Sequence, residues 1–256
     1  MTRNKIDITG NSLKMLAVIT MLIDHVAVGI VLLWLNNQTD ITVEQYNSYF
    51  EAYRVMRGIG RLAFPIYCFM LVEGFFHTHD VKKYMARLLA FALVSEIPFN
   101  LLLRRTLITF EKNNVGWALL IGLICIVIME KIKNSENLLF SNIIAGRVAM
   151  VIVMLVGMIV GYICNVDYGG AGIAAICVLY FLYSTEVNGR IFAIAMAVVV
   201  LALMSSKTEV YALVLAVPFY FYNGNRGTDS IALRRFFYLF YPVHLLVIYL
   251  IGLAIV

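Results

Sequence analysis

Charge is scarce in this sequence, since Asp, Glu, Lys and Arg make up only 14% of its 256 residues. A soluble globular domain carries about 25%. A soluble domain of this size also has no interior large enough for the 62% of residues that are hydrophobic here. The same figures exclude disordered chains, collagen-like repeats and disulfide scaffolds. An integral membrane protein remains, and the long apolar runs without strand alternation predict helical spans.

Several motifs of soluble enzymes are also missing. The four cysteines lie singly within apolar runs and form no CxxC pair, which is typical of small core residues. A Walker A loop, a Rossmann glycine pattern and a nucleophile elbow are absent, which argues against nucleotide hydrolysis and serine-hydrolase chemistry. The four histidines lack HExxH spacing, so neither a metal site nor a tightly bound cofactor is expected. The net charge of +5 comes from basic residues scattered at the ends of apolar runs, so nucleic acid is not an expected partner.

Nine apolar runs approach the length of about 20 residues that a membrane-spanning helix needs. They cover residues 12–35, 58–76, 84–103, 115–130, 147–164, 169–183, 190–204, 210–222 and 236–256, of which the sixth to the eighth are short. The connections are short and no internal repeat is evident. The sequence therefore predicts one all-α domain over residues 1–256, a polytopic transmembrane helix bundle of about nine helices.

Lysine and arginine counts predict the orientation of the bundle in the lipid bilayer. With nine spans, thirteen of these residues, including Arg3 and Lys5, fall on the side of the N-terminus, and seven fall on the other side. Basic residues are enriched in cytoplasmic loops. The N-terminus is therefore expected in the cytoplasm, and the bacterial inner membrane is the expected location.

The longest outer connection, residues 36–57, has an aromatic pattern of its own. Tyr46, Tyr49, Phe50 and Tyr53 recur at the spacing of one helix face. Such a helix lies in the interface of the outer leaflet or forms a lid over an outward-facing site, and the pattern leaves both interpretations open.

The first span carries Lys14, Asp24 and His25, which are costly residues in a membrane. Lys14 and His25 are eleven residues apart, so on a helix they point to nearly the same face, about 16 Å apart along the axis. A cation at the membrane edge aligned with a deeper imidazole suits an anionic carrier that threads its reactive end inward. Asp24 orients a ring nitrogen of His25 or pairs with a basic residue on another helix. The structural alternative treats Lys14 as a topology signal and Asp24 and His25 as a polar pair.

The second span has polar residues at both ends. Arg57 and Arg61 are spaced i, i+4 at its outer end, and Glu73 and His77 have the same spacing at its inner end. Pro65 between them removes a backbone hydrogen bond and predicts a kink. Arginines that extend to the headgroups and an interfacial histidine are the structural alternative.

The third and ninth spans hold two further groups. Arg87 and Glu96 in the third span favour structural ion pairs across the bundle. Tyr241, Pro242 and His244 occur together in FYPVH, where the proline is expected to break the ninth span near its start. A lone histidine of this kind is more often structural than catalytic.

Several of these motifs together resemble a known family. The motifs are LKMLAVITMLIDH, GRLAFPIYCFMLVEGFFHTHD, SEIPFN, DYGGAG (residues 167–172), NGNRG (residues 223–227) and FYPVH. In this order, from Lys14 to His244, they resemble the TraX family of polytopic acetyltransferases, named for the N-terminal acetylation of conjugative pilin. The spacing of Lys14 and His25 is also similar to that of the wider membrane acyltransferase-3 class, which uses cytoplasmic acetyl-CoA to modify acceptors across the membrane.

The resemblance implies that His25 is the catalytic histidine and that Lys14 lies near the donor. His244 resembles the late Tyr-x-x-His of the acyltransferase-3 class. Residues 113–117 depart from the family pattern, because Val115, Gly116 and Trp117 stand where relatives carry a threonine. A role for this loop is therefore not transferred.

Together these features predict an acetyl-CoA-dependent acetyltransferase. The donor phosphates meet Lys14 and any of Arg147, Arg234 and Arg235. His25 acts as general base or carries the acetyl group covalently, with Asp24 fixing its tautomer. The acceptor, a pilin-type protein N-terminus or an envelope glycan, is oriented by Arg57 and Arg61, with Glu73, His77, Tyr241 and His244 in supporting positions. A transporter and a noncatalytic subunit of a pilus or secretion machine are the alternatives. An inverted internal repeat would support the transporter, and none is evident in the sequence.

Overall fold

The computed structural model describes residues 7–135 and 142–255, so Arg3 and Lys5 lie outside the described residues. These two ranges form helices, and their only β pairing consists of isolated bridges. In chain order the helices are α1 (Gly10–Val26), a π-helix (Ala27–Leu32), α2 (Leu33–Asn36), α3 (Val43–Gly60), α4 (Ala63–His77), α5 (Val81–Arg104), α6 (Val115–Lys133), α8 (Ile143–Ile163), α9 (Gly169–Phe181), α10 (Val187–Met204), a 3-10 helix (Lys207–Leu215), α11 (Ala216–Phe221) and α12 (Ile231–Ile255).

By length and composition, seven of the described helical stretches are suited to crossing a membrane. They are Gly10–Asn36, Val43–His77, Val81–Arg104, Val115–Lys133, Ile143–Ile163, Val187–Met204 and Ile231–Ile255. The expected all-α polytopic bundle is confirmed, and the protein is an integral membrane protein. Two of the short expected spans are not among these seven because their helices are too short. α9 has 13 residues, and residues 210–222 are divided between the 3-10 helix and the six residues of α11.

Local sequence signals account for where many of the helices begin. Thr42 and Gln45 form a capping box at the start of α3, and the Asn114 side chain accepts a hydrogen bond from the Gly116 amide at the start of α6. Asp80 caps α5 by accepting from the Lys83 amide, and this hydrogen bond lowers the pKa of the Asp80 carboxyl. Such caps satisfy amides that a helix leaves without partners at its first turn.

The outcome differs between the two prolines. Pro65 is the third residue of α4, and the helical stretch is interrupted just before α4, at the turn of Arg61 and Leu62. This interruption lies where a proline at position 65 removes a backbone hydrogen bond, so it agrees with the expected kink. Pro242 lies inside a continuous α12, so the expected break of the ninth span is wrong. Because α12 begins at Ile231, the proline falls in its interior, where neighbouring helices hold the chain.

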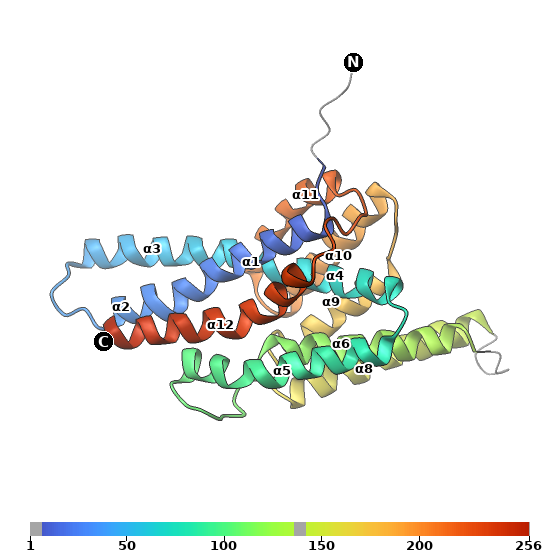
Figure 1. The fold of residues 1–256 in the computed structure, drawn as a ribbon, viewed down its shortest axis with the longest axis horizontal. Coiled ribbons are helices and arrows are strands. Elements are labelled where there is room, and N and C mark those ends of the chain that lie inside the picture. Colours follow the sequence, from blue (N-terminus) through green and yellow to red (C-terminus); the bar gives the residue numbers. More distant parts are fainter. Residues whose placement is uncertain (1–6, 136–141, 256) are drawn as a thin grey trace, which may run out of the picture.

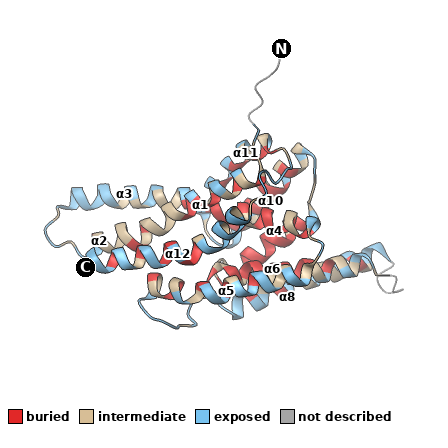
Figure 2. Ribbon diagram, viewed as in Figure 1, coloured by how far each residue is buried: buried red, intermediate tan, exposed pale blue. Residues whose placement is uncertain are grey.

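The bundle places α1 between two later parts of the chain. α1 packs against α3, α4 and α12, and α12 also packs against α5 (Figure 1). Buried residues concentrate around α4, α6, α9 and α10, whereas α3, α8 and the outer face of α12 are largely exposed (Figure 2). α3 lies along α1, and its Tyr49 ring packs on Trp34 at 5.0 Å between centroids. The polar residues of α1 therefore face neighbours that are far away in sequence.

Candidate functional site

Two adjoining cavities lie beside the start of α1. One has a volume of about 500 Å³ and is lined mainly by residues of α1, α4, α5, α12 and the loop before α12. The other has a volume of about 690 Å³ and lies against the first turns of α12. Both linings include Lys14, Arg87, Arg226, Phe237 and Tyr238. These shared residues mark the junction of the two cavities.

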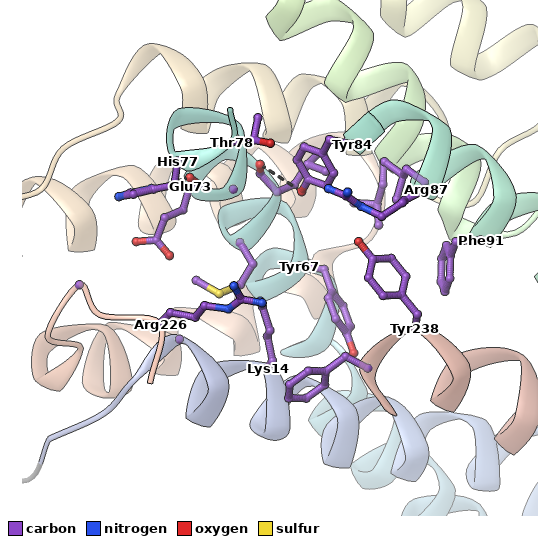
Figure 3. A pocket seen from close by; sticks show the side chains of 18 of the residues that line it. Lys14, Tyr67, Glu73, His77, Thr78, Tyr84, Arg87, Phe91, Arg226 and Tyr238 are labelled. Carbon is purple, nitrogen blue, oxygen red and sulfur yellow. Dashed lines mark hydrogen bonds between the residues drawn. The ribbon is translucent and has the colours of Figure 1, made fainter. Parts of the chain in front are cut away.

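The two linings together are strongly basic. Besides the three basic residues at the junction, Arg234 and Arg235 line the second cavity, whereas Glu73 is the one acidic residue in either lining. Figure 3 shows Lys14 and Arg226 close together on one wall, with Arg87 beside Tyr84 on another. Arg226 and Arg234 each lie 3.4 Å from Asp229, which offsets part of this charge. The positive charge that remains favours a ligand with several negative charges, such as phosphates.

Three of the four predicted donor-binding residues line these cavities, but Arg147 does not. Lys14, Arg234 and Arg235 are among the lining residues. Arg147 lies exposed near the start of α8 and lines neither cavity. Arg147 is therefore not part of these cavities, because the fold carries the start of α8 away from the start of α1 (Figure 1).

The NGNRG segment places Arg226 at the junction. The amide of Gly10 donates to the Asn225 carbonyl at 2.8 Å, and the amide of Asn11 donates to the Arg226 carbonyl at 2.9 Å. Gly227 has a φ of 86°, and an added side chain there would strike Thr9. The glycine thus permits the close approach that fixes this loop against the start of α1.

Glu73 and His77 lie on the opposite wall of the first cavity. The hydroxyl of Tyr222 donates to Glu73 Oε2 at 2.7 Å, and the guanidinium of Arg190 lies 4.9 Å from the centre of the Tyr222 ring. His77 directs Nδ1 to the backbone carbonyl of Glu73 at 2.8 Å and is exposed. Both predicted residues therefore line the first basic cavity.

His25 lies deeper along α1 and contacts α12. Its Nδ1 is 2.7 Å from Nε2 of His244, which is 219 residues later in the chain. Nδ1 of His244 is in turn 2.7 Å from the carbonyl oxygen of Phe240. Tyr241 completes the group, with its ring 5.9 Å from that of His25 and 5.7 Å from that of His244. The structure thus brings three of the predicted site residues together.

Aromatic residues separate the first cavity from His25. Tyr67 and Phe91 line the cavity and also pack against the apolar cluster that contains Tyr241. The rings of Phe91 and Tyr241 are 5.4 Å apart, and Tyr241 contacts His25. These aromatic side chains therefore link the lining of the first cavity to the residues that contact His25.

Asp24 does not contact the His25 ring. Its Oδ2 lies 2.5 Å from Nη1 of Arg57 on α3, and Gly60 packs so closely on this carboxylate that a side chain there would strike it. The expectation that Asp24 orients His25 is wrong, and the alternative that it pairs with a basic residue on another helix is confirmed. The reason is the turn of about 100° between consecutive residues of a helix, which directs Asp24 to α3 and His25 to α12.

Arg61 and Arg87 also have partners that differ from the expected ones. Arg61 forms an ion pair with Glu209 at 2.9 Å, and Glu209 is fully buried. Arg87 lines both cavities and lies 5.8 Å from the Tyr84 ring. Glu96 accepts hydrogen bonds from the side chains of Asn114 and Trp117 at 2.5 and 2.9 Å, so the predicted ion pairing of the third span is wrong for this carboxylate.

Sequence reasoning missed two residues of the basic cavities and one buried charge. Arg226 lies in a loop between Gly224 and Gly227, and only the pairing of that loop with residues 8–11 brings it to Lys14. The sequence favours an ion-pair role for Arg87, and Glu209 comes directly before the expected span at residues 210–222. The NGNRG motif was the one available signal, since a loop rich in glycine and asparagine with an arginine suggests a shaped turn.

Comparison with known proteins relates this site to a family. The family model described as TraX protein matches residues 9–252. The chain is also 29% identical over 266 residues to a protein of Dichelobacter nodosus named probable fimbrial assembly protein FimC, serogroup H1, with 96% of each chain covered. No solved structure matches. The matched range includes the basic cavities, the histidine pair and both charged pairs described above.

Proposed function

Since the chain belongs to the TraX family, we propose that it is a membrane acetyltransferase. It moves an acetyl group from cytoplasmic acetyl-CoA to an amine or hydroxyl of an acceptor on the outer side of the membrane. One observation carries this proposal: the same helix, α1, borders two basic cavities at its start and presents His25 to the bundle interior further along.

The cavities suit the two ends of such a donor. The phosphates and nucleotide occupy the second cavity and the junction, where Lys14, Arg87 and Arg226 supply positive charge. The uncharged arm of the donor enters the first cavity and follows Tyr67 and Phe91 toward His25. Positive charge at the cavities fits an N-terminus in the cytoplasm, where acetyl-CoA is available and basic loops are enriched.

His25 is the general base in this mechanism. It takes the proton of the acceptor amine or hydroxyl while that nitrogen or oxygen bonds to the thioester carbonyl carbon. The carbon–sulfur bond then breaks, and the imidazolium returns the proton to the leaving thiolate. The products are the acetylated acceptor and CoA with a free thiol, and His25 is neutral again. In a two-step variant His25 itself accepts the acetyl group before the acceptor attacks.

The acceptor approaches from the side of Asp24 and Arg57. The side chains of this pair are 20% and 28% exposed, whereas Lys14 lies at the other end of the same helix, toward the basic cavities. The name of the relative from Dichelobacter nodosus supports a fimbrial or pilin-type subunit as acceptor. An envelope glycan is the second acceptor to be tested.

Acetyl transfer by the purified protein tests the proposal. Labelled acetyl-CoA is supplied with a peptide that has a free N-terminal amine, and separately with a hydroxyl-bearing glycan. We expect transfer to one of them and a loss of at least about 100-fold for His25→Ala, the contribution typical of a positioned base. His79→Ala is the matched control, because His79 is exposed and lines neither cavity.

Two results would contradict the proposal. Full activity of His25→Ala would remove His25 from the reaction. The absence of both transfer and thermal stabilisation by acetyl-CoA would favour the transporter or the noncatalytic subunit instead.

A further inference from the structure

We propose that His244 is a positioning residue that fixes the tautomer of His25, so that Nε2 of His25 is the atom that receives the acceptor's proton. The effect on acetyl transfer rests on the proposed function, whereas the effect on the tautomer does not. The inference starts from a short chain of hydrogen bonds that joins α1 to α12.

The chain of hydrogen bonds begins at a backbone carbonyl. The oxygen of Phe240 can only accept, and Nδ1 of His244 is 2.7 Å from it, so that nitrogen must carry a hydrogen. A neutral imidazole carries one ring hydrogen. Nε2 of a neutral His244 is therefore bare and can only accept.

The same reasoning then determines the state of His25. Its Nδ1 lies 2.7 Å from the bare Nε2 of His244, and two bare nitrogens do not form a hydrogen bond, so Nδ1 of His25 carries the hydrogen. Nε2 of His25 is then the bare nitrogen. It makes no hydrogen bond to any other residue that the structure describes, which leaves its lone pair available to a substrate.

The surroundings of the pair keep both rings neutral. His244 is 6% exposed, its ring stacks on that of Phe240 at 4.6 Å, and Tyr241 makes edge contacts with both imidazoles. The carboxylate nearest in sequence, Asp24, is engaged by Arg57. A charged imidazole without a carboxylate partner is costly in such a place, so the resting tautomers follow from the geometry.

His244 also has a role once His25 has taken the proton. The imidazolium of His25 then donates through Nδ1 to the lone pair of His244, and His244 donates to the Phe240 carbonyl. The positive charge is thus met by a neutral imidazole and a backbone dipole rather than by a carboxylate. His244 on α12 thus fixes the tautomer of His25, which is the role expected of Asp24, because α12 lies on the face of α1 that carries His25.

The tautomer is measured without any substrate. Nitrogen NMR of the detergent-solubilised full chain, labelled with ¹⁵N-histidine, resolves the ring nitrogens, and the four histidines are assigned by single substitutions. We expect the wild-type His25 to be protonated at Nδ1 and bare at Nε2, and we expect His244→Ala to convert it to a mixture or to the other tautomer. Protonation of His25 at Nε2 in the wild type would overturn the inference.

The kinetic test separates positioning from packing. We expect His244→Ala to lower kcat by on the order of 100-fold with little change in acetyl-CoA binding, and we expect added imidazole to restore much of the activity by occupying the vacated space. His244→Phe fills that space without an acceptor nitrogen, so we expect the same loss without rescue. His79→Ala again serves as the control, because His79 lies outside the cavities.

The outcomes distinguish the two proposals. A wild-type kcat in His244→Ala would overturn the role of His244. So would an equal loss of kcat in His244→Ala and His244→Phe that imidazole does not restore while the tautomer of His25 is unchanged. If the wild-type protein transfers no acetyl group, the proposed function fails, and the NMR measurement still decides whether His244 sets the tautomer of His25.

Discussion

Removal of the Lys14 charge is the sharpest test of where the donor binds. Lys14 lines both cavities at their junction and is half-buried, with its ammonium 5.9 Å from the centre of the Phe237 ring. Lys14→Met keeps an unbranched side chain of similar length and removes the charge together with the hydrogen-bond donors of the ammonium group. Arg147→Gln is the matched control, because Arg147 lines neither cavity and lies exposed on α8.

The expected size of the effect follows from burial. A hydrogen bond to a charged group contributes about 1.5–3 kcal/mol, which corresponds to about 10- to 150-fold in affinity. An exposed ion pair contributes only about 0–1 kcal/mol. We therefore expect Lys14→Met to raise the Michaelis constant for acetyl-CoA by about 10- to 150-fold. Arg235→Gln, at an exposed position of the second cavity, should raise it by less than about 5-fold.

The assay measures the Michaelis constant and the maximal rate of labelled acetyl transfer for the variants side by side. An unchanged Michaelis constant for Lys14→Met would refute the donor site at the cavity junction. An equal increase for Arg147→Gln would refute it too, because the effect would then reflect the overall charge of the protein rather than contact with the donor. Repeating the acetyl-CoA titration at higher salt distinguishes direct contact with the donor from an effect of overall charge. Salt screens distant exposed charges more strongly than buried contacts, so an effect of overall charge should shrink while an effect of direct contact remains.

Two further predictions concern stability, measured as thermal unfolding in detergent. Arg61→Met leaves the fully buried Glu209 without its ion-pair partner and should lower the free energy of unfolding by about 3–5 kcal/mol; the double variant with Glu209→Gln should recover part of this loss, and a purely additive loss would contradict the pairing. Gly60→Ala places a methyl group against the Asp24 carboxylate and should cost about 1–3 kcal/mol, so an unchanged unfolding temperature would show that α3 can move away from α1.

Much of the fold followed from composition and hydrophobic runs. A helical bundle is the only arrangement that satisfies the backbone of long apolar runs in a membrane, so the runs that became α1, α5, α6, α8, α10 and α12 were recognisable. The ends were less predictable. α12 begins five residues before the expected start at residue 236 and continues through Pro242, because tertiary packing overrides the local effect of a proline.

The candidate site followed from the sequence only where its residues share one helix. Lys14 and His25 were predicted to lie on nearly the same face of the first span, and one lines the basic cavities while the other faces α12. The residues of other helices that contact Lys14 and His25 could not be predicted. Apolar surfaces that face lipid and apolar surfaces that face a neighbouring helix have the same composition, so the sequence does not show which helices are neighbours.

The class of protein, the helical bundle and the two polar positions of α1 can be read from the amino-acid sequence, because hydropathy and the 3.6-residue period are local properties. Which charged and polar groups pair with one another depends instead on how the helices pack. The packing directs Asp24 to Arg57, keeps Arg147 away from the basic cavities, brings Arg226 to Lys14 and places His244 against His25 across 219 residues. These pairings depend on which helices are neighbours, and a hydrogen bond such as the one of 2.7 Å between His25 and His244 leaves no periodic pattern in the sequence.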